Sequence, residues 1–93
     1  MWVKYLGSTP AKTTKGYPIK GCTWYVFELE SEFNAKYCEA SFLMFVRSYG
    51  ANALFHRENR LVMETSEGIL DGNRAEHLKE ALLRMIEDKE TGI

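Results

Sequence analysis

The segment from Ser31 to Gly50 carries apolar side chains on two opposite sides if it forms a helix. At 100° per residue, one stripe contains Phe33, Tyr37, Ala40 and Met44, and the opposite stripe contains Ala35, Cys38, Phe42, Phe45, Val46 and Tyr49. Ser31 is a suitable N-cap, and Gly50 suits the left-handed conformation that ends many helices. Because a helix with two apolar sides needs two partners, we expect one stripe to cover a sheet and the other to contact a second helix or a second copy of the chain.

A second interpretation of this segment is a short helix at 32–39 followed by a strand from Ser41 to Ser48. The run from 42 to 46 is rich in aromatic and β-branched residues, which have high β propensity. We prefer the single helix because both of its ends carry suitable capping residues.

Strand patterns dominate the first thirty residues. Residues 2–6 alternate and are rich in β-forming types, and the Gly-Ser-Thr-Pro run at 7–10 predicts their end. Residues 11–16 form a polar loop, and residues 17–21 add at most a short edge segment. The strongest strand pattern covers Cys22 to Glu30, whose first half is apolar on both faces and therefore indicates a central position in a sheet.

The second half of the chain predicts a hairpin and a helix. Two short strands at 53–57 and 60–64 flank Glu58-Asn59, where Asn59 is expected to supply the positive φ of a two-residue turn. Gly68 and Asp71-Gly72 indicate a further turn. Asn73 is the expected N-cap of a last helix, with a single apolar stripe at Ala75, Leu78, Ala81, Leu82, Met85 and Ile86.

These elements predict one α+β domain over residues 1–93. We expect a small antiparallel sheet of about four to five strands with two helices packed on it, in the order β-(β)-β-α-β-β-α. The chain is 45% apolar, which is sufficient for a core. No secretory signal or membrane-length apolar run is visible, so we expect a cytoplasmic protein without membrane contact.

Residue types that catalyse reactions or bind metals are present without the required spacing. Cys22, Cys38, His56 and His77 include no closely spaced metal-binding pair, and the two cysteines are expected to be buried free thiols. Glu28 and Glu30 share a strand face, where solvated carboxylates are common. No glycine-rich phosphate motif occurs. We therefore expect no enzyme activity, cofactor or metal.

Charge is distributed unevenly along a chain whose net charge is −1. Residues 1–20 contain four lysines and no acid, and the exposed loop candidates Lys12, Lys15, Tyr17 and Lys20 could contact a nucleic acid or another anion. Residues 57–93 carry six basic and nine acidic residues. Their acidic side chains Glu76, Glu80 and Glu87 could face a basic partner, as in inhibitors of host enzymes that mobile elements encode.

Residues 3–8 read Val-Lys-Tyr-Leu-Gly-Ser, which resembles the start of the first strand in phosphotyrosine-binding domains. In that family the segment leads into a helix and a longer β-sandwich. Here a lysine-rich loop follows, and the chain is too short for that fold, so the resemblance assigns no site residue.

The sequence therefore favours a non-enzymatic binding or regulatory protein that acts through protein contacts as a homodimer. The residues expected to mediate self-association are Phe42, Phe45, Val46 and Tyr49, with Phe33 and Tyr37 as the alternative stripe. Nucleic-acid or anion binding by residues 12–20, and inhibition of a host enzyme by the acidic helix face, are the alternatives.

Overall fold

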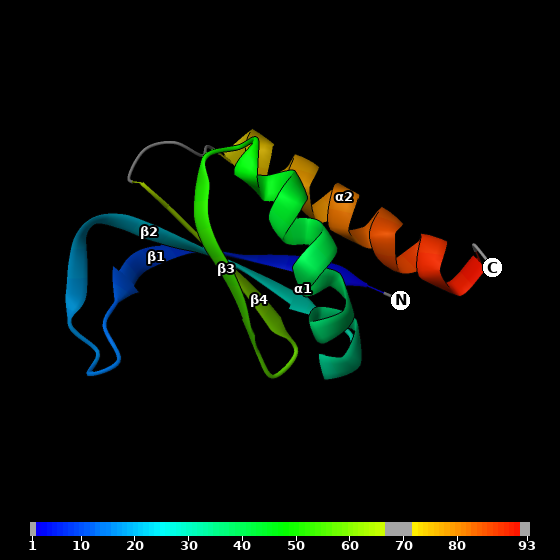
Figure 1. Ribbon diagram of the computed structural model, residues 1–93, viewed down its shortest axis with the longest axis horizontal. Coiled ribbons are helices and arrows are strands. Elements are labelled where there is room, and N and C mark those ends of the chain that lie inside the picture. Colours follow the sequence, from blue (N-terminus) through cyan, green and yellow to red (C-terminus); the bar gives the residue numbers. More distant parts are fainter. Residues whose placement is uncertain (1, 67–71, 92–93) are drawn as a thin grey trace.

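The computed structural model describes residues 2–66 and 72–91, with side chains described for 2–66 and 73–87. Its described part contains four strands and two helices: β1 (Val3–Lys12), β2 (Pro18–Leu29), α1 (Glu32–Arg47), β3 (Ala51–Arg57), β4 (Arg60–Ser66) and α2 (Gly72–Thr91). The strands form one antiparallel sheet in the order β1-β2-β4-β3. Both helices lie on the same side of the sheet, α1 across β3 and α2 across β1 (Figure 1). The predicted α+β class is confirmed.

Helix α1 is one continuous element, as the capping residues predicted. The side chain of Ser31 accepts a hydrogen bond from the backbone N–H of Asn34 at 3.1 Å, which satisfies one of the free donors of the first turn. After the last turn, Gly50 takes the expected left-handed conformation with a φ of 84°. The alternative with a strand from Ser41 to Ser48 is wrong.

The first two strands are longer than predicted. The first strand was predicted to end at Leu6, but β1 continues to Lys12 because Gly7, with a φ of 112°, forms a bulge and not a turn. Pro10 is tolerated because β1 is an edge strand. The two segments expected at 17–21 and 22–30 are one strand, β2, so the sheet has four strands in the described residues.

The hairpin between β3 and β4 was predicted at the correct residues, but the positive φ belongs to Glu58, at 56°, and not to Asn59. Asn59 instead joins the hairpin to the end of β2. Its side-chain Nδ2 donates to the carbonyl of Leu29 at 2.8 Å, and its own carbonyl accepts from the Leu29 N–H at 2.8 Å. Helix α2 already includes Gly72, so Asn73 is not its N-cap. The turn predicted around Gly68 lies outside the described residues.

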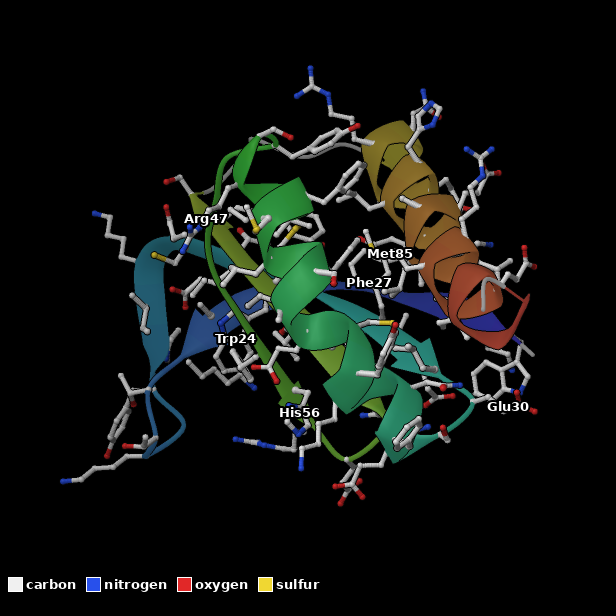
Figure 2. All side chains as sticks on the ribbon, turned by 45° about the vertical axis from the view of Figure 1, so that its right-hand side comes forward. Trp24, Phe27, Glu30, Arg47, His56 and Met85 are labelled. Atoms are coloured by element: carbon white, nitrogen blue, oxygen red, sulfur yellow. The ribbon has the colours of Figure 1, made fainter. Side chains whose placement is uncertain are left out.

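The core lies between the sheet and the helices. Alternate residues of the strands face this layer, and the buried members are Val3, Tyr25, Phe27, Leu29, Leu54, Leu61 and Met63. From the helices, the ring of Phe42 packs edge-on against Phe27, with centroids 6.0 Å apart. In Figure 2, Phe27 lies between the sheet and the helices, whereas Trp24 of the same strand lies on the other side of the sheet. That other side carries neither helix.

Candidate interaction surfaces

The side of α1 that points away from the sheet is an apolar stripe exposed to solvent. We call Phe33, Tyr37, Ala40 and Met44 the outer stripe. The exposed fractions are 64% for Phe33, 48% for Tyr37 and 76% for Met44. The rings of Phe33 and Tyr37 are stacked, with centroids 6.5 Å apart and an angle of 19° between their planes. Large apolar side chains aligned on one helix face in this way are typical of contact surfaces.

The opposite side of α1 is inside the protein, which corrects the predicted self-association set. Phe42 and Val46 are completely buried in the core and cannot face a second copy of the folded chain. Phe45 is 36% exposed and its ring is stacked on Phe42. Tyr49 is half-buried against Phe45. This side of α1 therefore packs against the sheet and α2. The alternative stripe with Phe33 and Tyr37 is the one that remains exposed.

Phe45 and Tyr49 contribute to a hollow where α1 meets α2. The remaining lining comes from four residues of α2, His77, Glu80, Ala81 and Arg84. His77, Glu80 and Arg84 are exposed at this junction, and Tyr49 is half-buried.

The predicted anion-binding residues lie together on the β1–β2 hairpin, which projects from the rest of the protein (Figure 1). Lys12, Lys15 and Lys20 are exposed, and Tyr17 is exposed over 67% of its surface. The loop is held by the Thr13 N–H, which donates to the Tyr17 carbonyl at 2.8 Å, and by the Tyr17 N–H, which donates to the Thr13 hydroxyl at 3.2 Å. The hairpin therefore presents Tyr17 on an ordered turn.

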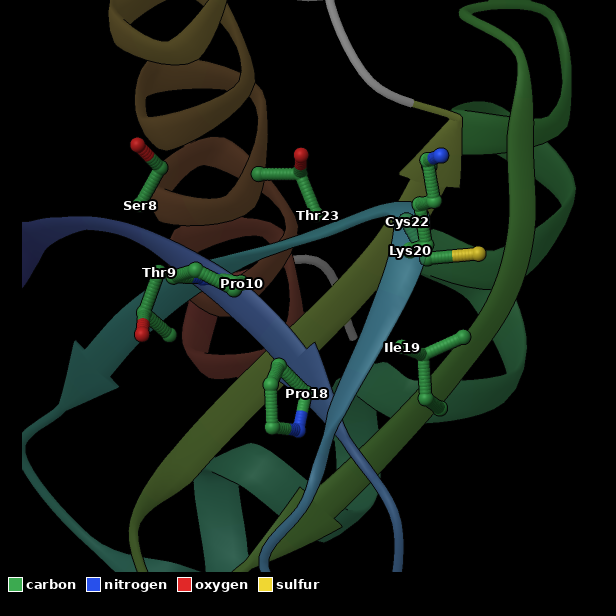
Figure 3. Close-up of a pocket in the computed structure, with 9 residues that line it drawn as sticks. Ser8, Thr9, Pro10, Pro18, Ile19, Lys20, Cys22 and Thr23 are labelled. Atoms are coloured by element: carbon green, nitrogen blue, oxygen red, sulfur yellow. The ribbon is translucent and has the colours of Figure 1, made fainter.

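A hollow of about 350 Å³ follows the same hairpin (Figure 3). It is lined mainly by small polar side chains and prolines, with Lys20 and Cys22 as its only titratable lining residues. Both of these residues belong to β2.

The three acidic residues predicted to face a basic partner lie along one exposed side of α2. Glu76, Glu80 and Glu87 are each exposed and share a helix face at this spacing. Glu76 pairs with Lys79 at 3.1 Å. This pairing makes the face mixed in charge near its N-terminal end.

The residues considered for catalysis are separated or already paired. Cys38 is completely buried in the core, while Cys22 is only partly buried, contrary to the expectation of two buried thiols. His56 contacts Glu39 of α1, with Nδ1 and Oε2 2.5 Å apart. Glu28 accepts from Arg60 at 3.4 Å, and Glu30 lies beyond the end of β2. Within the described residues, no group of three His, Cys, Asp or Glu side chains could hold a metal ion.

One surface was not predicted from the sequence: the side of the sheet that neither described helix covers. We call Trp24, Val26, Phe55 and Val62 the outer sheet face. Trp24 donates from Nε1 to Glu64 at 3.0 Å, and its ring meets Phe55 edge-on with centroids 5.5 Å apart. The available signal was the first half of the strand pattern from Cys22 to Glu30, which is apolar on both faces.

Comparison with protein-family models, curated proteins and solved structures finds no significant match for this chain. Neither described helix combines the length and apolar character that a membrane crossing requires. The surfaces themselves are therefore the basis for assigning a function.

Proposed function

We propose that this protein is a non-enzymatic binding protein that pairs with a second copy of itself through the outer stripe of α1. The observation that carries the proposal is the exposure of Phe33, Tyr37 and Met44 along a single helix face. Protein interfaces concentrate aromatic residues and methionine at their centres, whereas isolated surfaces rarely group them.

The charges at the two ends of α1 support an antiparallel pair of helices. Glu32 is exposed in the first turn, and Arg47 is exposed in the last turn. When two copies of α1 pair about a twofold axis perpendicular to the helices, the first turn of each helix lies beside the last turn of its partner. Each Glu32 then approaches an Arg47 of opposite charge, and the two helix dipoles run in opposite directions. From Phe33 to Met44 the stripe spans about 16 Å, enough for three helical turns of contact.

The oligomeric state tests this proposal. We expect sedimentation equilibrium to show a dimer at micromolar concentration, and Met44→Glu to give a folded monomer because it places a charge within the apolar contact. Tyr17→Glu is the matched control, since it changes another exposed large side chain outside the stripe and should leave the dimer intact.

A charge exchange tests the antiparallel arrangement. Glu32→Lys should weaken the dimer, and the double variant Glu32→Lys with Arg47→Glu should restore part of the loss. Circular dichroism checks that α1 remains helical in each variant. A wild-type protein that stays monomeric at high micromolar concentration would refute the proposal.

A second candidate function is the binding of single-stranded nucleic acid by the β1–β2 hairpin. The observation in its favour is Tyr17, which is widely exposed at the end of a hairpin that also carries Lys12, Lys15 and Lys20. Exposed aromatic rings stack on bases, and lysines contact phosphates. Binding of an oligonucleotide should then fall steeply with salt and should be lost when the three lysines are changed to Gln. Binding that does not depend on salt would exclude this function.

A further inference from the structure

The outer sheet face contains a hollow that has an apolar floor and a charged end. Its volume is about 200 Å³. The floor is formed by Trp24, Val26, Phe55 and Val62, and the end is formed by Arg57, Glu58 and Arg60, which are the residues around the β3–β4 turn. A hollow with this lining can hold one bulky apolar side chain of a binding partner, next to a polar residue of the same partner.

The floor of the hollow is already formed in the unbound chain. Val26 pairs with Val62, and Phe55 pairs with Val62 on the other side, so the three side chains form one row across the sheet. Val62 is buried although it is not part of the core. The hydrogen bond from Trp24 to Glu64 fixes the indole beside this row. An incoming group would therefore meet an ordered surface, which lowers the entropy cost of binding.

Two arginines and one glutamate line the end of the hollow, and the one excess positive charge favours an anion. Arg57 and Arg60 lie directly opposite each other in the pairing of β3 with β4, and like charges in this position destabilise a sheet. Glu28 accepts from Nε and Nη2 of Arg60, both at 3.4 Å. Among the described side chains, Arg57 forms no ion pair. Its guanidinium group is thus available to a carboxylate of a binding partner.

We propose that the outer sheet face binds an extended segment of a partner protein that carries a bulky apolar side chain directly followed by acidic residues. The apolar side chain occupies the space above Val26 and Val62, and the carboxylate pairs with Arg57. The outer stripe of α1 lies on the other side of the protein, so both surfaces can be occupied at once. A dimer formed through α1 would then present two such sites facing away from each other.

A peptide titration tests this site. The probe is the hexapeptide acetyl-Gly-Gly-Phe-Asp-Glu-Gly-amide, and the signal is the indole N–H resonance of Trp24 in a Trp2→Phe background, where it is the only indole. We expect this resonance to shift with saturation in the micromolar to millimolar range. Peptides in which Phe is replaced by Ala, or Asp-Glu by Asn-Gln, should bind at least about fivefold more weakly, because each loses one of the two contacts.

Variants on the protein side assign the charged contact. Arg57→Gln should weaken the Asp-Glu peptide about fivefold and leave the Asn-Gln peptide unchanged. Glu58→Gln, which removes a negative charge from the same hollow, should strengthen binding of the acidic peptide. Lys20→Gln is the matched control, because it removes a cation of β2 outside the hollow and should have no effect.

Three results would overturn the proposal. The first is an indole resonance that does not move with peptide, and the second is equal affinity for the Asp-Glu and Asn-Gln peptides. The third is a shift of the resonance that follows protein concentration without peptide, which would assign this face to a second copy of the chain. Repeating the titration with Met44→Glu separates this test from dimerisation, since the monomer should bind the peptide equally well.

Discussion

Phe33 and Phe42 are the same residue type on opposite sides of α1, and truncating each to Ala should have very different effects on folding. Phe42 is completely buried, between Phe27 and Phe45. Removing its ring leaves a cavity in the core and should lower the free energy of unfolding by about 3–5 kcal/mol. A chain of this length has a total stability of roughly 5–14 kcal/mol, so Phe42→Ala should remove a large part of it.

Phe33→Ala removes a side chain that is 64% exposed and stacked on Tyr37. The ring loses little burial within one chain, and the stacking contact is worth about 0.5–1 kcal/mol, so the expected loss is below about 1 kcal/mol. Urea denaturation measures both values. With a slope of about 2 kcal/mol per molar urea, Phe42→Ala should lower the midpoint by about 2 M and Phe33→Ala by less than about 0.5 M.

Both measurements belong in the Met44→Glu background, because dimerisation would otherwise add to the apparent stability. In the wild-type chain, dimerisation should depend more on Phe33 than on Phe42, because Phe33 lies in the outer stripe. Phe33→Ala should therefore weaken the dimer. Equal losses of folding stability for the two variants would refute the assignment of the two sides of α1.

Two further predictions concern folding stability. Glu58→Asn should raise the free energy of unfolding by about 0.5–1 kcal/mol in urea denaturation, because Asn tolerates the φ of 56° that Glu58 adopts; an unchanged or lower value would show that the turn is not strained. Burial, with a smaller contribution from Tyr25, raises the pKa of Tyr5 above its usual value, so this phenol stays neutral in the folded chain at a pH where it ionises in the unfolded chain. The resulting stabilisation is fully present below about pH 10 and is lost as the pH rises through the folded pKa. The Tyr5→Phe variant has no ionisable group at this position. Its free energy of unfolding relative to the wild type should therefore increase between pH 8 and pH 11, and a difference that stays constant with pH would contradict this.

Much of the architecture follows from local patterns in the sequence. The single helix between Ser31 and Gly50 and the hairpin with strands at 53–57 and 60–64 were predicted because period, caps and turn residues agree over several turns or strand pairs. The lengths of β1 and β2 were not predicted, because a glycine such as Gly7 is equally compatible with a turn and with a bulge. Only pairing with β2 makes it a bulge, because the partner strand supplies the hydrogen bonds on both sides of it.

For the candidate surfaces, too, the sequence determined one part and the tertiary structure decided the rest. The sequence alone determined that α1 has two apolar sides, because the angle between side chains is a property of the helix itself. The tertiary structure decided that the side with Phe42 is covered and the side with Phe33 is exposed. It also placed both helices on one side of the sheet, which left Trp24 and Phe55 on the uncovered side. The physical reason is that burial depends on which elements meet, and this depends on contacts between residues that are distant in the chain.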